Sequence, residues 1–225
     1  MRPDMQLLPM WFVAFLLSIT VHEAAHALAG KLLGDDTAES QVTINPIPHI
    51  KREPFGTILV PMLSYVISGW MLGWASAPYD PFWRARHPHR GAWVALAGPV
   101  SNLLLAIAAA IAIHIGIAAG VFSYPYALSF SRIVASSGPG IWEGASIFLS
   151  ILFSLNILLF AFNLIPVPPL DGITAIGLLM DEENANKVAE FSQNPHFAFF
   201  GILIAWKLAD FVIPPVFSFA LHLLY

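Results

Sequence analysis

The chain has 225 residues, of which 57% are hydrophobic and only 11% are charged, and its formal net charge at pH 7 is -4. Ordinary soluble domains are about 45–50% apolar and about 25% charged, so the composition excludes a soluble globular domain. The lack of a basic tract excludes a nucleic-acid partner, and the lack of cysteine excludes disulfides, thiolate nucleophiles and sulfur-rich metal sites.

Apolar segments recur along the whole chain. They cover residues 7–33, 57–77, 91–121, 141–165 and 197–225. A membrane-spanning helix needs about 20 apolar residues, so four segments are long enough to cross the bilayer, and 57–77 is borderline. We therefore expect an all-α membrane protein: a single-domain, polytopic bundle of transmembrane helices in the lipid bilayer, with a small membrane-associated β or re-entrant element.

The first segment carries the sequence His22-Glu23-Ala24-Ala25-His26. Residues four apart lie on one face of a helix, so both imidazoles can reach one ion. Glu23 is turned by about 100° from His22, which lets it contact a water on the metal without being a ligand. Ionisable groups at this depth in a membrane need partners or a task, and the spacing fits the chemistry of a zinc hydrolase.

The polar stretch that follows, residues 37–55, is predicted to be strand and loop. Gln41 to Ile44 alternates polar and apolar residues and could form a short strand. An exposed strand edge here, or at residues 74–79, could pair with a substrate backbone. His49 lies in this stretch and is a candidate accessory metal contact, the alternative being a solvated loop histidine.

The fate of the borderline segment, 57–77, can be judged from the basic residues in the connections. Pro61, Gly69 and Gly73 interrupt the segment, which suits a broken hairpin. If it crosses the membrane like the other four segments, the Lys and Arg residues of the connections divide five to four between the two sides. If it re-enters the membrane, they divide seven to two. The seven are Lys31, Lys51, Arg52, Arg84, Arg86, Arg90 and Lys187, and the two are Arg2 and Arg132. Cytoplasmic loops normally carry such an excess, so we favour four crossings and one re-entrant element.

A catalytic zinc ion usually has three protein ligands and one open position. The best candidate for the third ligand is Asp171, because Pro166, Pro168 and Pro169 break the preceding helix and can aim a carboxylate. In the re-entrant topology Asp171 lies on the same side of the membrane as the two histidines. Two asparagines in apolar surroundings, Asn102 and Asn163, are candidates for holding substrate backbone or a developing oxyanion. Interhelical hydrogen bonds are an equally good explanation of them.

These motifs together resemble the site-2 proteases, a family of zinc intramembrane proteases. His-Glu-Ala-Ala-His resembles the first family motif, and the sequence from Asn163 to Gly172 resembles the second. The sequence from Ala97 to Asn102 resembles a further element, expected at the start of a core helix. The resemblance implies one Zn²⁺ per chain, held by His22, His26 and Asp171, with Glu23 as catalytic base.

The function expected from this resemblance is a zinc-dependent endopeptidase that cleaves transmembrane segments of membrane proteins, in regulated intramembrane proteolysis. Its expected location is a prokaryotic plasma (inner) membrane. One alternative is a metal-binding membrane protein without protease activity, such as a transporter or an inactive regulator, although Glu23 would then have no task. Another is an intramembrane zinc hydrolase that acts on lipid or prenylated substrates. The sequence predicts neither the substrate nor the oligomeric state.

Overall fold

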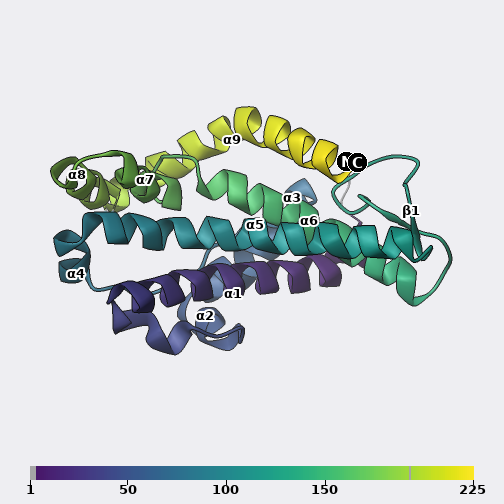
Figure 1. The fold of residues 1–225 in the computed structure, drawn as a ribbon, viewed down its shortest axis with the longest axis horizontal. Coiled ribbons are helices and arrows are strands. Elements are labelled where there is room, and N and C mark those ends of the chain that lie inside the picture. The colour runs from purple at the N-terminus through teal and green to yellow at the C-terminus, as the bar shows by residue number, and fades with distance from the viewer. Residues whose placement is uncertain (1–3, 193) are drawn as a thin grey trace. The chain divides into compact units, whose positions relative to one another are not determined.

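The computed structural model describes residues 4–192 and 194–225, so Arg2 of the charge count lies outside the described residues. Within them, the α-helices are α1 (Leu8–Leu33), α2 (Ile47–Arg52), α3 (Val60–Ser68), α4 (Pro81–Arg86), α5 (Pro88–Ala118), α6 (Ile141–Asn163), α7 (Asp171–Ala175), α8 (Glu182–Ser192) and α9 (Pro195–Leu224) (Figure 1). The short elements are η1 (Met5–Leu7), η2 (Asp36–Gln41), η3 (Phe55–Leu59), η4 (Ile176–Leu179), β1 (Phe122–Ser123) and β2 (Ala135–Ser136).

The four long helices confirm the predicted fold class. Stretches long and apolar enough to cross a membrane are Met5–Leu33, Pro88–Ala118, Ile141–Asn163 and Phe197–Leu224. The ends of these stretches differ from those of the predicted segments by three residues or fewer. The agreement is close because a run of about 20 apolar residues defines a membrane span in the sequence and in the structure alike.

The borderline segment forms a helix followed by a return of the chain. The apolar helix Phe55–Ser68 is too short to cross a membrane, and it ends at Gly69, whose positive φ of 81° suits glycine. The chain then runs back, so that the Trp74 amide donates to the Gly56 carbonyl over 3.1 Å. At Gly73 a Cβ atom would lie only 2.2 Å from the Gly56 carbonyl oxygen. This hairpin suits the predicted re-entrant element, whose place in the membrane stays a prediction.

The strand expected at Gln41 to Ile44 is wrong. Asp35 caps the 3₁₀ helix Asp36–Gln41 by accepting from the Thr37 amide, and Thr43 and Ile44 form a bend. Pro46 is the N-cap of α2, and Pro48 lies in its first turn, where a missing N–H is tolerated. Within the described residues the sheet is instead the antiparallel pair β1 and β2, in the connection between α5 and α6.

The chain divides into two compact units. Unit 1 contains the residues up to Thr20, Asn45–Ser76 and Leu103–Ile157. Unit 2 contains Val21–Ile44, Ala77–Asn102 and Leu158–Tyr225. Helices α1, α5 and α6 therefore contribute residues to both units.

Unit 1 contains a buried group of uncharged polar residues, which we call the serine–asparagine cluster: Ser18, Ser146, Ser150 and Asn156. The Asn156 amide nitrogen donates to the Ser18 hydroxyl over 2.8 Å and so ties α6 to α1. The Ser150 hydroxyl accepts from the Ile133 and Val134 amides, over 2.9 and 3.1 Å. These bonds satisfy backbone and hydroxyl groups that apolar surroundings would otherwise leave without partners.

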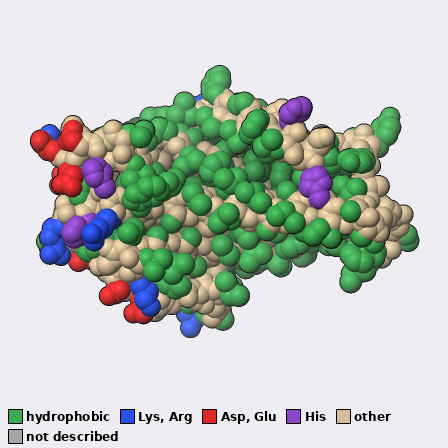
Figure 2. All heavy atoms as spheres, viewed as in Figure 1, with side chains coloured by type: hydrophobic (Ala, Val, Ile, Leu, Met, Phe, Trp, Pro, Cys, Tyr) green, Lys and Arg blue, Asp and Glu red, His purple; other side chains and the backbone are tan. Residues whose placement is uncertain are grey.

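Unit 2 carries most of the charged surface. Figure 2 shows Lys, Arg, Asp and Glu side chains gathered over α4 and α8, two helices of unit 2. The interior of unit 2 includes a small apolar core between the end of α6 and α9, made of Phe162, Ile165, Leu170, Ala205 and Ala209. This core fixes the segment that leads from α6 into α7.

Candidate metal centre

The second half of α1 presents three potential metal ligands to one point. His22 and Glu23 are buried, with 8% and 5% of their surface exposed. The Nε2 atoms of His22 and His26 lie 3.0 Å apart, and one potential ligand atom from each of the three residues lies within 4.8 Å of the other two. This is the arrangement that the four-residue spacing of the histidines predicts.

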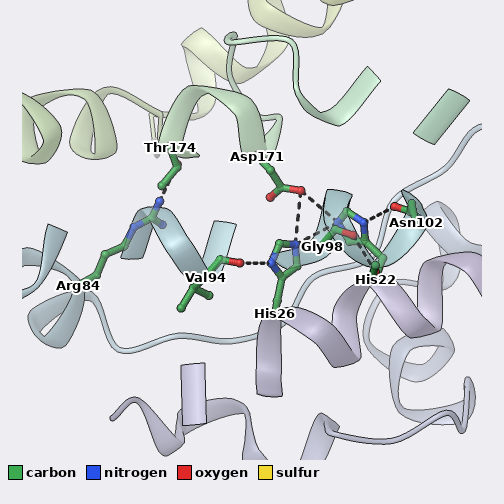
Figure 3. Close-up of polar contacts among 9 residues, drawn as sticks. His22, His26, Arg84, Val94, Gly98, Asn102, Asp171 and Thr174 are labelled. Carbon is green, nitrogen blue, oxygen red and sulfur yellow. Dashed lines mark hydrogen bonds and ion pairs between the residues drawn. The ribbon is translucent and has the colours of Figure 1, made fainter. Parts of the chain in front are cut away.

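Helix α5 provides a hydrogen-bond partner for the Nδ1 atom of each imidazole ring. The Nδ1 atom of His22 lies 2.7 Å from Oδ1 of Asn102, and Nδ1 of His26 lies 2.7 Å from the carbonyl oxygen of Val94 (Figure 3). Both partners are acceptors, so each Nδ1 carries the proton and each Nε2 presents its lone pair to the centre. A ring held in this way has its ligand tautomer and its orientation fixed before any metal binds.

Gly98 allows α5 to come this close to the histidines. It lies on α5 midway between Val94 and Asn102, directly against the two rings (Figure 3). A Cβ atom at this position would lie 2.3 Å from Nε2 of His26 and 2.5 Å from Nε2 of His22, well inside van der Waals contact. The sequence from Ala97 to Asn102, expected at the start of a core helix, lies instead in the interior of α5, and Ala97 is nine residues after Pro88, where this helix begins.

Asp171 reaches the same point from a segment about 145 residues further along the chain. It is the first residue of α7, and its Oδ2 atom lies 3.1 Å from Nε2 of His22 and 3.4 Å from Nε2 of His26. The following residue, Gly172, packs directly on the chain that leaves α6. A Cβ atom there would lie 2.4 Å from the Leu164 carbonyl oxygen, so only glycine permits this close approach.

A hydrogen bond from α4 supports the helix that carries Asp171. The guanidinium of Arg84 donates to the Thr174 hydroxyl over 2.6 Å (Figure 3), and it lies 4.9 Å from the centre of the Tyr79 ring. The sequence predicted Arg84 only as one of several basic residues in a connection. Its contact with α7 joins positions 90 residues apart, and no local pattern points to it.

The donor set fits a divalent cation such as zinc. Two imidazole lone pairs and a carboxylate oxygen face one another across 3.0–3.4 Å, and with the protons on Nδ1 no hydrogen lies between them. Three such acceptors need a positive charge among them, and two histidines with one carboxylate form a common ligand set for catalytic zinc.

The remaining predicted site residues lie in different surroundings. Asn102 joins the centre through His22, as described above. Asn163 is the half-buried last residue of α6, eight positions before Asp171. His49 is buried in α2, which belongs to unit 1, and the group of potential metal ligands found in the described residues does not include it. The accessory role of His49 and the substrate role of Asn163 stay predictions.

Comparison with known proteins identifies the family. The model of peptidase family M50 matches residues 10–206, most of the chain, so the chain belongs to peptidase family M50, and its resemblance to the site-2 proteases is confirmed. With four helices suited to crossing a membrane, it is a membrane metalloprotease of this family, and zinc is the metal that the family implies.

Two relatives are similar over most of the chain. "Putative zinc metalloprotease YwhC" of Bacillus subtilis is 34% identical over 94% of this chain and 87% of its own length. "Putative zinc metalloprotease Rip2" of Mycolicibacterium smegmatis is 24% identical over 80% of this chain and 60% of its own length. No solved structure matches this chain significantly.

Proposed function

We propose that this member of peptidase family M50 is a zinc-dependent intramembrane endopeptidase that cleaves transmembrane segments of membrane proteins. The observation that carries the proposal is the convergence of His22, His26 and Asp171 on one point, with Glu23 beside it. Three of these residues, His22, Glu23 and His26, lie within a helix suited to crossing a membrane, where a substrate that also spans the membrane can reach them.

In this proposal the ligands and the base have separate tasks. His22, His26 and Asp171 hold the metal, and Asn102 and the Val94 carbonyl keep the imidazoles in the ligand tautomer. Bound zinc would polarise the scissile carbonyl and lower the pKa of water enough for deprotonation near neutral pH. Glu23 accepts one proton from the water as its oxygen bonds to the carbonyl carbon. It then delivers that proton to the nitrogen as the C–N bond breaks.

The presence of Glu23 favours a hydrolase over the non-proteolytic alternatives. A transporter or an inactive regulator needs ligands but has no use for a buried acid one residue after a ligand. Glu23 is 5% exposed, and placing an acid at this depth is costly unless it has a task. The same carboxylate, within 4.8 Å of the histidine donor atoms, is close enough to act on a water molecule at the centre.

The test is a cleavage assay on transmembrane peptides with purified enzyme in lipid nanodiscs. The Glu23→Gln variant keeps the shape of the side chain but cannot accept a proton, so we expect cleavage to fall by about 10²-fold or more with bound zinc unchanged. The Asp171→Ala variant should lose both cleavage and zinc. If cleavage survives in Glu23→Gln, Glu23 is not the base. If the wild type cleaves water-soluble peptides in preference to membrane-spanning ones, the substrate class is wrong.

A further inference from the structure

Helix α9 is the least covered of the four long helices. Only 17% of its most apolar window is buried, against 72% for α6. The side that packs on unit 2 consists of small residues spaced by four: Gly201, Ala205 and Ala209. A Cβ atom at Gly201 would lie 1.8 Å from the Pro168 carbonyl oxygen, so α9 is pressed closely against the segment that leads to Asp171.

The opposite side of α9 carries two opposite charges, Lys207 and Asp210, and both side chains are exposed. At 100° per residue they lie about 200° and about 140° around the helix from Ala205, on the face directly opposite the packed one. Across residues 4–192 and 194–225, neither forms an ion pair or a hydrogen bond. Lys207 and Asp210 are three residues apart and could pair with each other, but they do not.

Lys207 and Asp210 both lie within the membrane, whichever part of α9 crosses the bilayer. The apolar stretch is Phe197–Leu224, and every window of about 20 residues within it contains both residues. Asp210 is at least five residues from either end of each window, or about 7.5 Å at 1.5 Å per residue. A lysine can extend its amine toward the headgroups, but a short aspartate cannot. An exposed acid at this depth requires a partner.

The exposed face also has the spacing of a helix–helix seam. It forms a stripe with intervals of three and four residues, which we call the α9 stripe. Its members are Phe200, Leu203, Lys207, Asp210 and Pro214, and all five are exposed. Phe200 and Leu203 are 62% and 54% exposed. Alternating intervals of three and four keep one stripe of side chains facing a parallel partner helix.

We propose that the α9 stripe is the interface with a second copy of this chain. Two copies share one topology in the membrane, so their α9 helices must run parallel, related by a two-fold axis along the membrane normal. Lys207 of each copy then lies about one helical turn from Asp210 of the other, so one symmetric contact forms two ion pairs and leaves no charge in the lipid. The stripe is self-complementary, and for that reason we assign it to a second copy rather than to a different membrane protein.

The first test is disulfide cross-linking in native membranes, because the chain contains no cysteine of its own. Leu203→Cys places a thiol in the stripe, and Ile204→Cys is the matched control. The two native side chains are neighbours and almost equally exposed, 54% and 51%, but Ile204 lies about 100° further around the helix. We expect Leu203→Cys to form a species of twice the chain mass and Ile204→Cys to form several-fold less. Equal yields, or a product of another mass, would overturn the proposal.

The second test distinguishes pairing between copies from pairing within one helix. In the Leu203→Cys background, Lys207→Asp gives a copy with two acids, and Asp210→Lys gives a copy with two lysines. Each variant expressed alone should lose the dimer several-fold, while their co-expression with different tags should restore it as a mixed dimer. If co-expression restores nothing, the charges do not pair across the interface. Unchanged zinc content of each variant confirms that it is folded, and this result does not depend on which substrate the enzyme cleaves.

Discussion

The metal centre of unit 2 and the serine–asparagine cluster of unit 1 both place polar side chains in apolar surroundings, but they use them differently. In the serine–asparagine cluster donors meet acceptors, as between Asn156 and Ser18 at 2.8 Å. In the metal centre, acceptors meet acceptors: two imidazole nitrogens and the Asp171 carboxylate face one another at 3.0–3.4 Å. The first arrangement is complete in itself, whereas the second needs a cation.

This difference separates a structural polar group from a functional one. Buried polar atoms are normally paired donor to acceptor, because a group left without a partner destabilises the fold. A cluster in which lone pairs converge is therefore retained for a ligand. Changes in the metal centre should alter zinc binding and catalysis, while similar changes in the serine–asparagine cluster should alter stability alone.

The largest effect is expected from adding a methyl group at Gly98 in the metal centre. In Gly98→Ala the new Cβ would lie 2.3 Å from Nε2 of His26 and 2.5 Å from Nε2 of His22, so the rings must turn away or α5 must shift. We expect zinc content and cleavage to fall to background. Zinc measured by elemental analysis and cleavage of a transmembrane peptide test this expectation.

Gly144→Ala is the matched control in unit 1. It is also a glycine within a long helix, α6, but its added Cβ would meet only the Met10 side chain, at 3.8 Å, an ordinary contact. We expect full zinc content and activity, with a gain in stability of about 0.4–1 kcal/mol from the less flexible unfolded chain. If Gly98→Ala behaves like this control, the close packing of α5 on the histidines is not needed for the site.

The next effect in size comes from a pair of asparagines. Asn102→Ala removes the acceptor for His22 Nδ1, at 2.7 Å, and should weaken zinc binding or activity by about 10–100-fold. Asn156→Ala removes hydrogen bonds to Ser18 and to the Leu152 carbonyl. It should lower the free energy of unfolding by about 1–2 kcal/mol with the zinc affinity unchanged.

A rescue experiment makes the role of Asn102 specific. Asn102→Asp still offers an oxygen to the Nδ1 proton of His22, so it should keep most of the zinc affinity that Asn102→Ala loses. Competition with a chelator measures that affinity, and thermal unfolding in detergent measures stability. Equal losses of zinc affinity in Asn102→Ala and Asn156→Ala would remove the distinction between the two regions.

The sequence predicts those parts of the site that depend on local spacing. The two histidines and Glu23 follow from four-residue periodicity within one helix, and Asp171 follows from the prolines that break the chain before it. The contacts of Asn102, Gly98 and Arg84 could not be predicted in this way. They join positions about 70–90 residues apart, and packing between helices determines them.

The same division applies to the fold. The long helices were predictable because about 20 apolar residues indicate a span whatever its neighbours. The expected strand at residues 41–44 was wrong because alternation over four residues is a weak signal, which the capping of a 3₁₀ helix by Asp35 outweighs. The strands β1 and β2 are only two residues each, too short to leave a pattern in the sequence.

Asp35 gives the smallest expected effect and extends the comparison to a second carboxylate of unit 2. Its two oxygens accept from the backbone amides of Thr37 and Asp80, each over 3.0 Å. Burial alone would raise its pKa, but these hydrogen bonds hold the pKa below the ordinary value of 3.8. Its contribution to stability is therefore complete above about pH 4 and is lost as the pH falls through the lower pKa of the folded state.

Asp35→Asn keeps one acceptor oxygen, so it should be less stable than the wild type by about 1 kcal/mol at pH 7, and this difference in stability should disappear in acid. Thermal unfolding of both proteins with a chelator present, so that loss of zinc does not contribute, measures this gap. A gap that stays constant from pH 7 into the acid range would mean that the charge of Asp35 does not stabilise this turn.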